Sequence, residues 1–141
     1  MTLFHLDVAG TPVRIVVTHI DRRDDTAVQL QAVSNLFLGL AEPAILMGDL
    51  NVTAEDPRLA ELLGTSGVSD VLATGAGNSA ADRIDWILVR GLECLSSGLV
   101  DHGESDHPLA WAELRLPAPS SEGTSVPPRT AVGSGARAET R

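Results

Sequence analysis

One stretch of the chain, residues 26–51, restricts the possible fold more than any other. Between residues 26 and 40 the apolar side chains recur every three or four positions, which predicts an amphipathic helix with one buried face. The apolar run 44–47 then predicts a short buried strand that ends abruptly in the polar turn 48–51. A helix followed by a buried strand is typical of an α/β fold, and a functional site is expected at the end of that strand.

Further strands are predicted on both sides of this stretch. Residues 3–8 and 13–18 flank the turn segment Ala-Gly-Thr-Pro at 9–12 and predict a β-hairpin or two neighbouring strands. Three later strands are expected at 84–89, 92–100 and 109–116. A short helix is expected to open at Asp56-Pro57 and to end at Gly64. The expected architecture is an α/β fold with a mixed sheet and flanking helices.

The composition changes after residue 116, where Pro, Ser, Gly, Thr and Ala dominate. Such a segment has too few large apolar side chains to bury, so residues 117–141 are expected to form a disordered tail behind a folded domain of residues 1–116. The single cysteine, Cys94, excludes an intrachain disulfide and a cysteine-rich zinc site.

The charge of the chain is strongly acidic, with 19 acidic residues against 10 arginines and a formal net charge of −9. This field repels long polyanions, although a divalent cation bound among carboxylates would reverse its sign locally. No apolar run is long enough to span a membrane, and the first five residues have neither the basic region nor the apolar core expected of a signal peptide. We expect a cytoplasmic chain, a location that a signal on a longer parent would change.

Polar residues follow or open predicted strands in four places: 18–19, 48–51, 83–86 and 105–107. Together they supply three carboxylates, one carboxamide and two imidazoles, from Asp49, Asp85, Asp106, Asn51, His19 and His107. Hard cations such as Mg²⁺ prefer oxygen ligands, while histidines can donate to phosphoryl oxygens or move protons near neutral pH. This set favours hydrolysis of a phosphate ester over acyl transfer.

The four motifs, in this order, resemble the C-terminal half of the endonuclease/exonuclease/phosphatase superfamily, which includes DNase I-like nucleases, neutral sphingomyelinases and inositol-phosphate phosphatases. The resemblance covers residues 1–116 and implies half of a DNase I-like two-sheet α/β sandwich. It also implies a phosphoesterase that depends on Mg²⁺ or Mn²⁺ and cleaves a phosphodiester or a phosphomonoester. The acidic charge favours a small substrate or a lipid headgroup over a long nucleic acid.

Three positions match the family's residues around the metal and the attacking water. By resemblance, Asp49 orients or deprotonates the water and contributes to the metal site. Asn51 would help to hold the water and the phosphate. Asp106 would be a metal ligand, directly or through water.

Three further positions match residues that surround the scissile phosphate. By resemblance, His107 contacts the phosphate as a general base or as a stabiliser of the transition state, and Asp85 fixes its tautomer by accepting the other ring N–H. His19 would hydrogen-bond a phosphate oxygen or help to protonate the leaving group. A simpler interpretation of Asp85 is an ion pair with Arg83 or Arg90 at the surface.

The resemblance also implies parts that this sequence does not contain. Family members place a metal-binding glutamate and a phosphate-contacting asparagine before the Thr-His segment, whereas only 17 residues precede Thr18 here. The alternative expectation is therefore a catalytically inactive fragment, or a module that needs a complementing N-terminal half. A half-sandwich would expose an apolar sheet face and an unpaired edge, which invite self-association or a complementing chain.

A third hypothesis is a small acidic interaction domain that has only the fold. Loss of Asp49 or His107 would then change nothing measurable.

Overall fold

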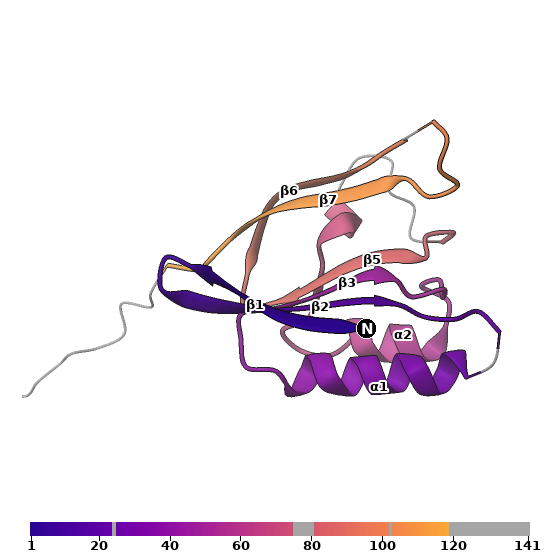
Figure 1. Cartoon of the computed structure of the whole chain (residues 1–141), viewed down its shortest axis with the longest axis horizontal. Coiled ribbons are helices and arrows are strands. Elements are labelled where there is room, and N and C mark those ends of the chain that lie inside the picture. The colour runs from indigo at the N-terminus through magenta and orange to yellow at the C-terminus, as the bar shows by residue number, and fades with distance from the viewer. Residues whose placement is uncertain (24, 75–80, 102, 119–141) are drawn as a thin grey trace, which may run out of the picture.

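The computed structural model describes residues 1–23, 25–74, 81–101 and 103–118. Three layers are stacked in it: a two-stranded sheet, a five-stranded sheet and a layer of two helices (Figure 1). In chain order the elements are β1 (Thr2–Val8), β2 (Thr11–His19), α1 (Thr26–Gly39), β3 (Ala44–Asp49), α2 (Pro57–Leu63), β4 (Ser69–Asp70), the 3₁₀ helix η1 (Val71–Thr74), β5 (Asp85–Arg90), β6 (Glu93–Val100) and β7 (Leu109–Arg115).

The large sheet is mixed, with strand order β1-β2-β3-β5-β4. β1 and β2 form an antiparallel hairpin. α1 connects β2 to β3, and β3 lies parallel to β2 in the sheet. β5 then runs antiparallel to β3. Because β2 and β3 are parallel, their carboxyl ends meet at the same edge of the sheet, where β5 begins.

The large sheet buries apolar side chains on both of its faces. One face packs against the helices, in a core to which α1 contributes Leu30 and Phe37, α2 contributes Leu59, and the sheet contributes Leu46 and Trp86. The opposite face packs against β6 and β7 in a second cluster, which includes residues of η1 and β5. Both clusters end before β1 is reached.

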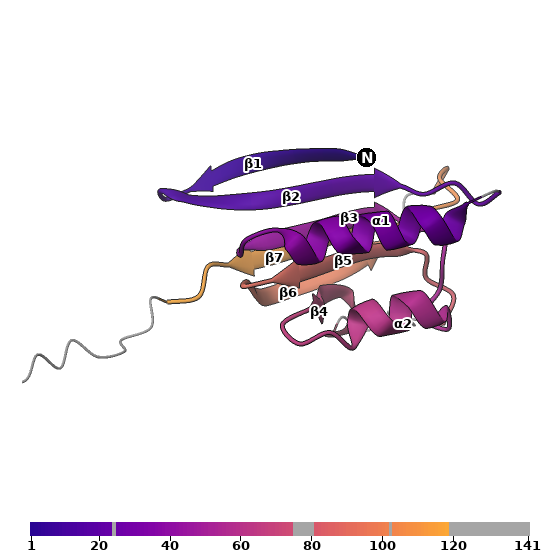
Figure 2. The same cartoon turned by 90° about the horizontal axis from the view of Figure 1, so that it is seen from below.

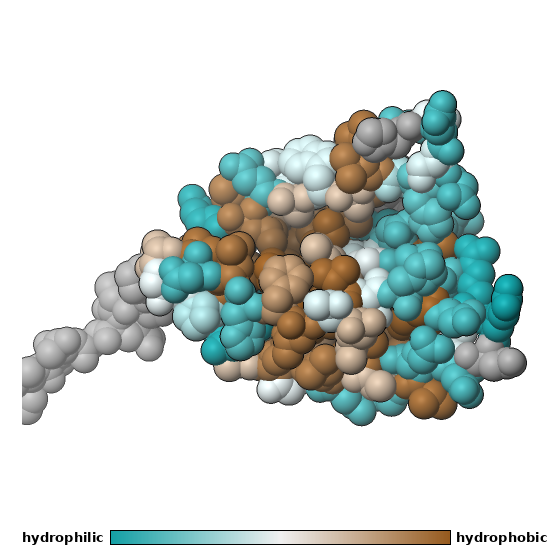
Figure 3. All heavy atoms as spheres, viewed as in Figure 1, coloured by the Kyte–Doolittle hydropathy of each residue, from teal (hydrophilic) through white to brown (hydrophobic). Residues whose placement is uncertain are grey.

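β1 lies at the margin of the sheet, to one side of both α1 and β7 (Figure 2). All seven of its residues are exposed. Its exposed large apolar side chains are Leu3, Phe4, Leu6 and Val8. Seen from the β1 side, hydrophobic residues gather over this strand and the neighbouring sheet (Figure 3). The molecule therefore presents an uncovered apolar margin between its two sheets.

The predicted fold class is confirmed: the structure is α/β, with a mixed sheet flanked by helices. The predicted hairpin, both helices and the three later strands are present within a few residues of their expected bounds. β4 and η1 were not predicted, since two paired residues and one short turn give no periodic pattern. From residue 119 onward, the expected tail lies outside the described residues.

None of the helices in the described residues has the length and apolar composition needed to cross a bilayer.

Candidate active site

Four separate segments of the chain reach one edge of the large sheet. His19 ends β2, Asp49 ends β3 and Asp85 begins β5, and these three residues are aligned across the sheet by its register. His107 lies in the β6–β7 connection, two residues before Leu109, the first residue of β7. The parallel β2–α1–β3 unit and the antiparallel return of β5 thus gather residues that are far apart in sequence.

A glycine permits the close approach of β2 and β3 at this edge. Gly48 has a φ of +134°, and a Cβ atom placed on it would lie 1.9 Å from the carbonyl oxygen of Thr18. No side chain fits in that space, since real Cβ atoms essentially never come within 3.0 Å of another heavy atom. Gly48 therefore allows His19 and Asp49 to stand side by side.

Asp49 is the centre of the cluster, and its side chain is 12% exposed. Its Oδ1 accepts a hydrogen bond of 2.8 Å from the backbone N–H of Asn51. Its Oδ2 lies 3.7 Å from Nε2 of His19 and 4.0 Å from Nε2 of His107. One carboxylate oxygen is thus fixed by the backbone, while the other faces two imidazoles across the opening.

His107 is held by Asp85, whose Oδ2 lies 2.7 Å from the Nδ1 atom of the ring. The hydrogen bond and the charge of Asp85 raise the pKa of His107, partial burial opposes the shift, and Asp106 and Asp49 add to it. With Nδ1 committed to Asp85, the Nε2 side of the ring is the one that faces Asp49.

Neither Arg83 nor Arg90 pairs with Asp85, so the simpler interpretation of Asp85 as the surface partner of an arginine is wrong. Arg83 pairs with Asp70 and stacks on Trp86, with its guanidinium carbon 4.1 Å from the ring centroid. Arg90 pairs with Glu42 at 3.1 Å. Both arginines thus have other acidic partners, and Asp85 faces His107.

Asn51 connects the two loops that follow β2 and β3. It has a left-handed backbone conformation with a φ of +52°. Its Nδ2 donates to the carbonyl oxygen of Ile20, and its Oδ1 accepts from Nε of Arg22. Through the backbone N–H that binds Asp49, the same residue couples these loops to the centre of the cluster.

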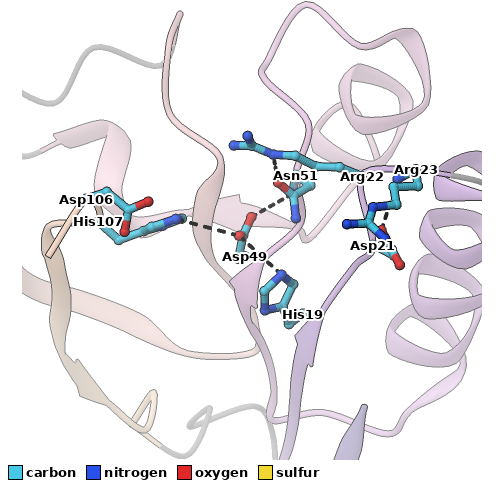
Figure 4. A pocket seen from close by; sticks show the side chains of 8 residues that line it. All are labelled: His19, Asp21, Arg22, Arg23, Asp49, Asn51, Asp106 and His107. Carbon is cyan, nitrogen blue, oxygen red and sulfur yellow. Dashed lines mark hydrogen bonds and ion pairs between the residues drawn. The ribbon is translucent and has the colours of Figure 1, made fainter.

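An open cavity of about 610 Å³ lies over this cluster (Figure 4). Eight residues line it, namely His19, Asp21, Arg22, Arg23, Asp49, Asn51, Asp106 and His107. Of the six predicted site residues, five line this cavity, and Asp85 lies behind His107 in an adjoining hollow of about 340 Å³. Sequence reasoning missed Asp21, Arg22 and Arg23, for which the only signal was their position directly after the Thr-His motif.

The donor atoms of this edge suit a hard divalent cation. Ligand atoms of Asp49, Asp85 and His107 all lie within 4.8 Å of one another. Asp85 and His107 are engaged with each other through Nδ1, whereas Asp49 turns Oδ2 toward the two imidazoles and has no hydrogen bond closer than these contacts at that oxygen among the described residues. Asp106, an exposed residue of the same cavity, offers a second carboxylate. A cation with few protein ligands and several waters is what Mg²⁺ prefers.

Comparison with known sequences finds one family. A sequence model described as Endonuclease/Exonuclease/phosphatase family matches residues 2–107. No curated protein matches the chain.

Comparison with solved structures finds the same type of fold. Humanised TDP2 of D. rerio is 20% identical with a TM-score of 0.64, and the match covers 81% of this chain and 57% of that one. An endonuclease/exonuclease/phosphatase of Beutenbergia cavernae is 21% identical with a TM-score of 0.64, over 81% of this chain and 38% of that one. A mannosyl-6-phosphatase of Bacteroides thetaiotaomicron is 20% identical with a TM-score of 0.56, over 77% of this chain and 53% of that one.

The chain thus spans between 38% and 57% of the length of these three structures.

Proposed function

Because the chain belongs to the Endonuclease/Exonuclease/phosphatase family, we propose that its strand-end cluster hydrolyses phosphate esters with the help of a divalent cation. The observation that carries the proposal is the arrangement of Asp49, His107 and Asp85. A carboxylate fixed through one oxygen faces an imidazole that a second carboxylate orients. This arrangement can direct a water molecule and move a proton within one cavity.

In this proposal Asp49 binds the attacking water through Oδ2 and accepts its proton as the water approaches phosphorus. Its other oxygen accepts the Asn51 N–H, and this contact holds the carboxylate in place. Asn51 also fixes the loop that carries it to the loop after β2. Positioning of this kind accounts for much of the rate enhancement in phosphoryl transfer, because the protein does little covalent chemistry itself.

His107 donates from Nε2 to a phosphoryl oxygen or to the leaving group. The hydrogen bond and charge of Asp85 raise the pKa of His107, which makes the ring a better proton holder than a free imidazole, and the same contact holds the ring in one orientation. His19 stands on the other side of Asp49 with a side chain that is 75% exposed, so a substrate can reach it from solvent.

The carboxylates of Asp49 and Asp106 would hold Mg²⁺ or Mn²⁺. When bound, the cation would neutralise charge on the phosphate, as metals do in phosphoryl transfer. The acidic net charge of −9 favours a small phosphoester or a lipid headgroup as substrate. Of the similar structures, one is titled a mannosyl-6-phosphatase, which accords with a small phosphorylated substrate.

The test is hydrolysis of bis-p-nitrophenyl phosphate and p-nitrophenyl phosphate by the full chain, with Mg²⁺, Mn²⁺ or EDTA. Asp49→Asn and His107→Gln are each expected to lower kcat/KM by about 100-fold or more, as loss of a proton-transfer group does. The matched controls are Asp7→Asn and His5→Gln, on exposed β1 and away from the cavity. Equal activity in Asp49→Asn and Asp7→Asn would refute the proposal and favour the interaction domain.

A second candidate is a module whose active site is completed by further polypeptide. One observation favours it: the uncovered apolar margin at β1, where Leu3, Phe4, Leu6 and Val8 are exposed. The occupant would be a strand-forming segment that covers Leu6 and Val8 of β1 and Leu114 of β7, which line one apolar hollow. A folded chain that hydrolyses neither ester with either metal, yet binds an apolar dye at this margin, would support the module. Metal-dependent hydrolysis by the chain alone would exclude it.

A further inference from the structure

Arg22 is the one arginine whose guanidinium is fixed to a residue of the candidate active site among the described side chains. It lies in the loop after β2, and its Nε donates to Oδ1 of Asn51. Figure 4 shows the side chain extending from this loop over the opening, above Asp49 and toward the side that carries His107. Arg22 also lines the adjoining hollow, so it stands where the two cavities meet.

Most of the hydrogen-bonding capacity of Arg22 faces the open cavity. A guanidinium carries five N–H donors in a planar fork. One is used at Asn51, and for the four on Nη1 and Nη2 no partner is found within the part of the chain that the structure describes. A fork of this kind matches the geometry of phosphate oxygens and binds them in pairs.

The arrangement around Asp49 leaves room for this role. His19 and His107 approach Asp49 from two sides at 3.7 and 4.0 Å. In Figure 4 Arg22 lies on a third side, near Asn51. A phosphate held over Asp49 would then meet imidazole donors and a guanidinium from different directions. Three such directions suit the three non-bridging oxygens of a terminal phosphate.

We propose that Arg22 forms a binding subsite for the non-bridging oxygens of a terminal phosphate, and that it makes the site selective for phosphomonoesters over phosphodiesters. The inference rests on the proposed function and specifies its substrate class. A phosphomonoester carries a charge of about −1.5 to −2 near neutral pH, against about −1 for a diester. The guanidinium therefore attracts the monoester more strongly. A diester would also direct its second substituent toward one of the donors.

Arg22 could in principle serve only to hold Asn51 in place. Asn51 keeps two other contacts, its Nδ2 to Ile20 and its backbone N–H to Asp49, neither of which involves Arg22. The loop should therefore keep its conformation without the guanidinium. Binding of free phosphate separates the roles, because a merely structural arginine would leave it unchanged.

The experiment is a titration of the full chain with inorganic phosphate, in EDTA and again with Mg²⁺, followed by the imidazole NMR signals of His19 and His107. Arg22→Gln is expected to weaken phosphate binding by about tenfold or more in both conditions, the usual effect of losing charge-assisted hydrogen bonds. Arg22→Lys keeps the positive charge but lacks the planar fork, so its phosphate affinity should lie between those of the wild type and Arg22→Gln. Arg115→Gln is the matched control, since Arg115 pairs with Glu93 and lies outside both cavities.

Phosphate that binds equally well to Arg22→Gln and to Arg115→Gln would overturn the subsite, as would a wild-type chain that binds no phosphate in either condition. Because inorganic phosphate is not hydrolysed, this result is independent of turnover. Arg22-dependent phosphate binding without hydrolysis would keep the subsite and contradict the proposed function. Hydrolysis that does not depend on Arg22 would keep the proposed function and contradict the subsite. In an active chain, Arg22→Gln should lower kcat/KM for p-nitrophenyl phosphate more than for bis-p-nitrophenyl phosphate.

Discussion

Among the glycines in the described parts of the chain, Gly48 is the one at which replacement by alanine should destabilise the fold most. The new Cβ would lie 1.9 Å from the Thr18 carbonyl oxygen, a backbone atom that cannot move without separating β2 from β3. The positive φ of +134° adds conformational strain. Strain of this kind costs about 1 to 3 kcal/mol and overpacking a similar amount, so the free energy of unfolding should fall by about 2 to 6 kcal/mol.

Two other glycines separate these contributions. Gly10 has a φ of +82° but nothing within 4 Å of an added Cβ, so Gly10→Ala should cost only the strain, about 1 to 3 kcal/mol. Gly39 lacks a left-handed φ and has equally open surroundings. Because it ends α1, Gly39→Ala should be neutral or stabilise by up to about 1 kcal/mol.

The assay is urea denaturation followed by tryptophan fluorescence, in which Trp86, buried in the helix-side core, is expected to change more on unfolding than the exposed Trp111. The order of midpoints should be Gly39→Ala highest, then wild type, Gly10→Ala and Gly48→Ala. A Gly48→Ala midpoint no lower than that of Gly10→Ala would refute the close approach of β2 and β3. That approach is also what brings His19 to Asp49, so its loss would undermine the site as well.

Three further changes test how the elements are held. Asp56→Ala should cost about 1 kcal/mol, because Asp56 caps α2 by accepting from the Arg58 backbone N–H. The hydrogen bond from the Arg58 side chain lowers the pKa of Asp56. In urea denaturation, the loss of unfolding free energy in Asp56→Ala should therefore be greatest at pH values above the ordinary aspartate pKa. It should shrink as the pH falls through the lowered pKa of Asp56. Arg90→Gln should cost about 1 to 3 kcal/mol in the same assay, since Nη1 of Arg90 donates to three carbonyl oxygens at the C-terminal end of α1. Trp86→Phe should cost about 1 kcal/mol or more in thermal unfolding, because it leaves the carbonyl oxygen of Val52 without its indole N–H donor.

The elements that could be predicted from the sequence are those in which the order of apolar and polar residues indicates which side chains are buried. The helix-side face of α1 recurs with helical period, and the apolar run of β3 is buried on two faces, so both gave clear signals. β4 escaped because it is a strand only by virtue of Ser69 and Asp70 pairing with β5. Such pairing depends on a partner distant in sequence, which local pattern does not reveal.

The candidate site was predictable in its members and less so in its geometry. Polar residues at strand ends pointed to four segments that the structure brings to one edge of the sheet, where the register aligns His19, Asp49 and Asp85 in one row. The contact of Asp85 with His107 matches the pairing that family resemblance implied. How close Asp106 would lie to the other carboxylates was not predictable, because it lies in the β6–β7 connection, whose path depends on the packing of the second sheet. Arg22 lies in a loop without periodicity, so its place in both cavities and its hydrogen bond to Asn51 became visible only in the structure.

Titration with Mn²⁺ tests most directly whether the strand ends form one divalent-cation site around Asp49. Paramagnetic Mn²⁺ broadens the NMR signals of nearby protons. Substoichiometric Mn²⁺ should broaden the ring signals of His19 and His107 strongly and that of His5, on β1, much less. Asp49→Asn should abolish this selectivity, whereas Asp7→Asn should preserve it. Equal broadening of all three histidines in the wild-type chain, or selective broadening that survives in Asp49→Asn, would contradict a site around Asp49.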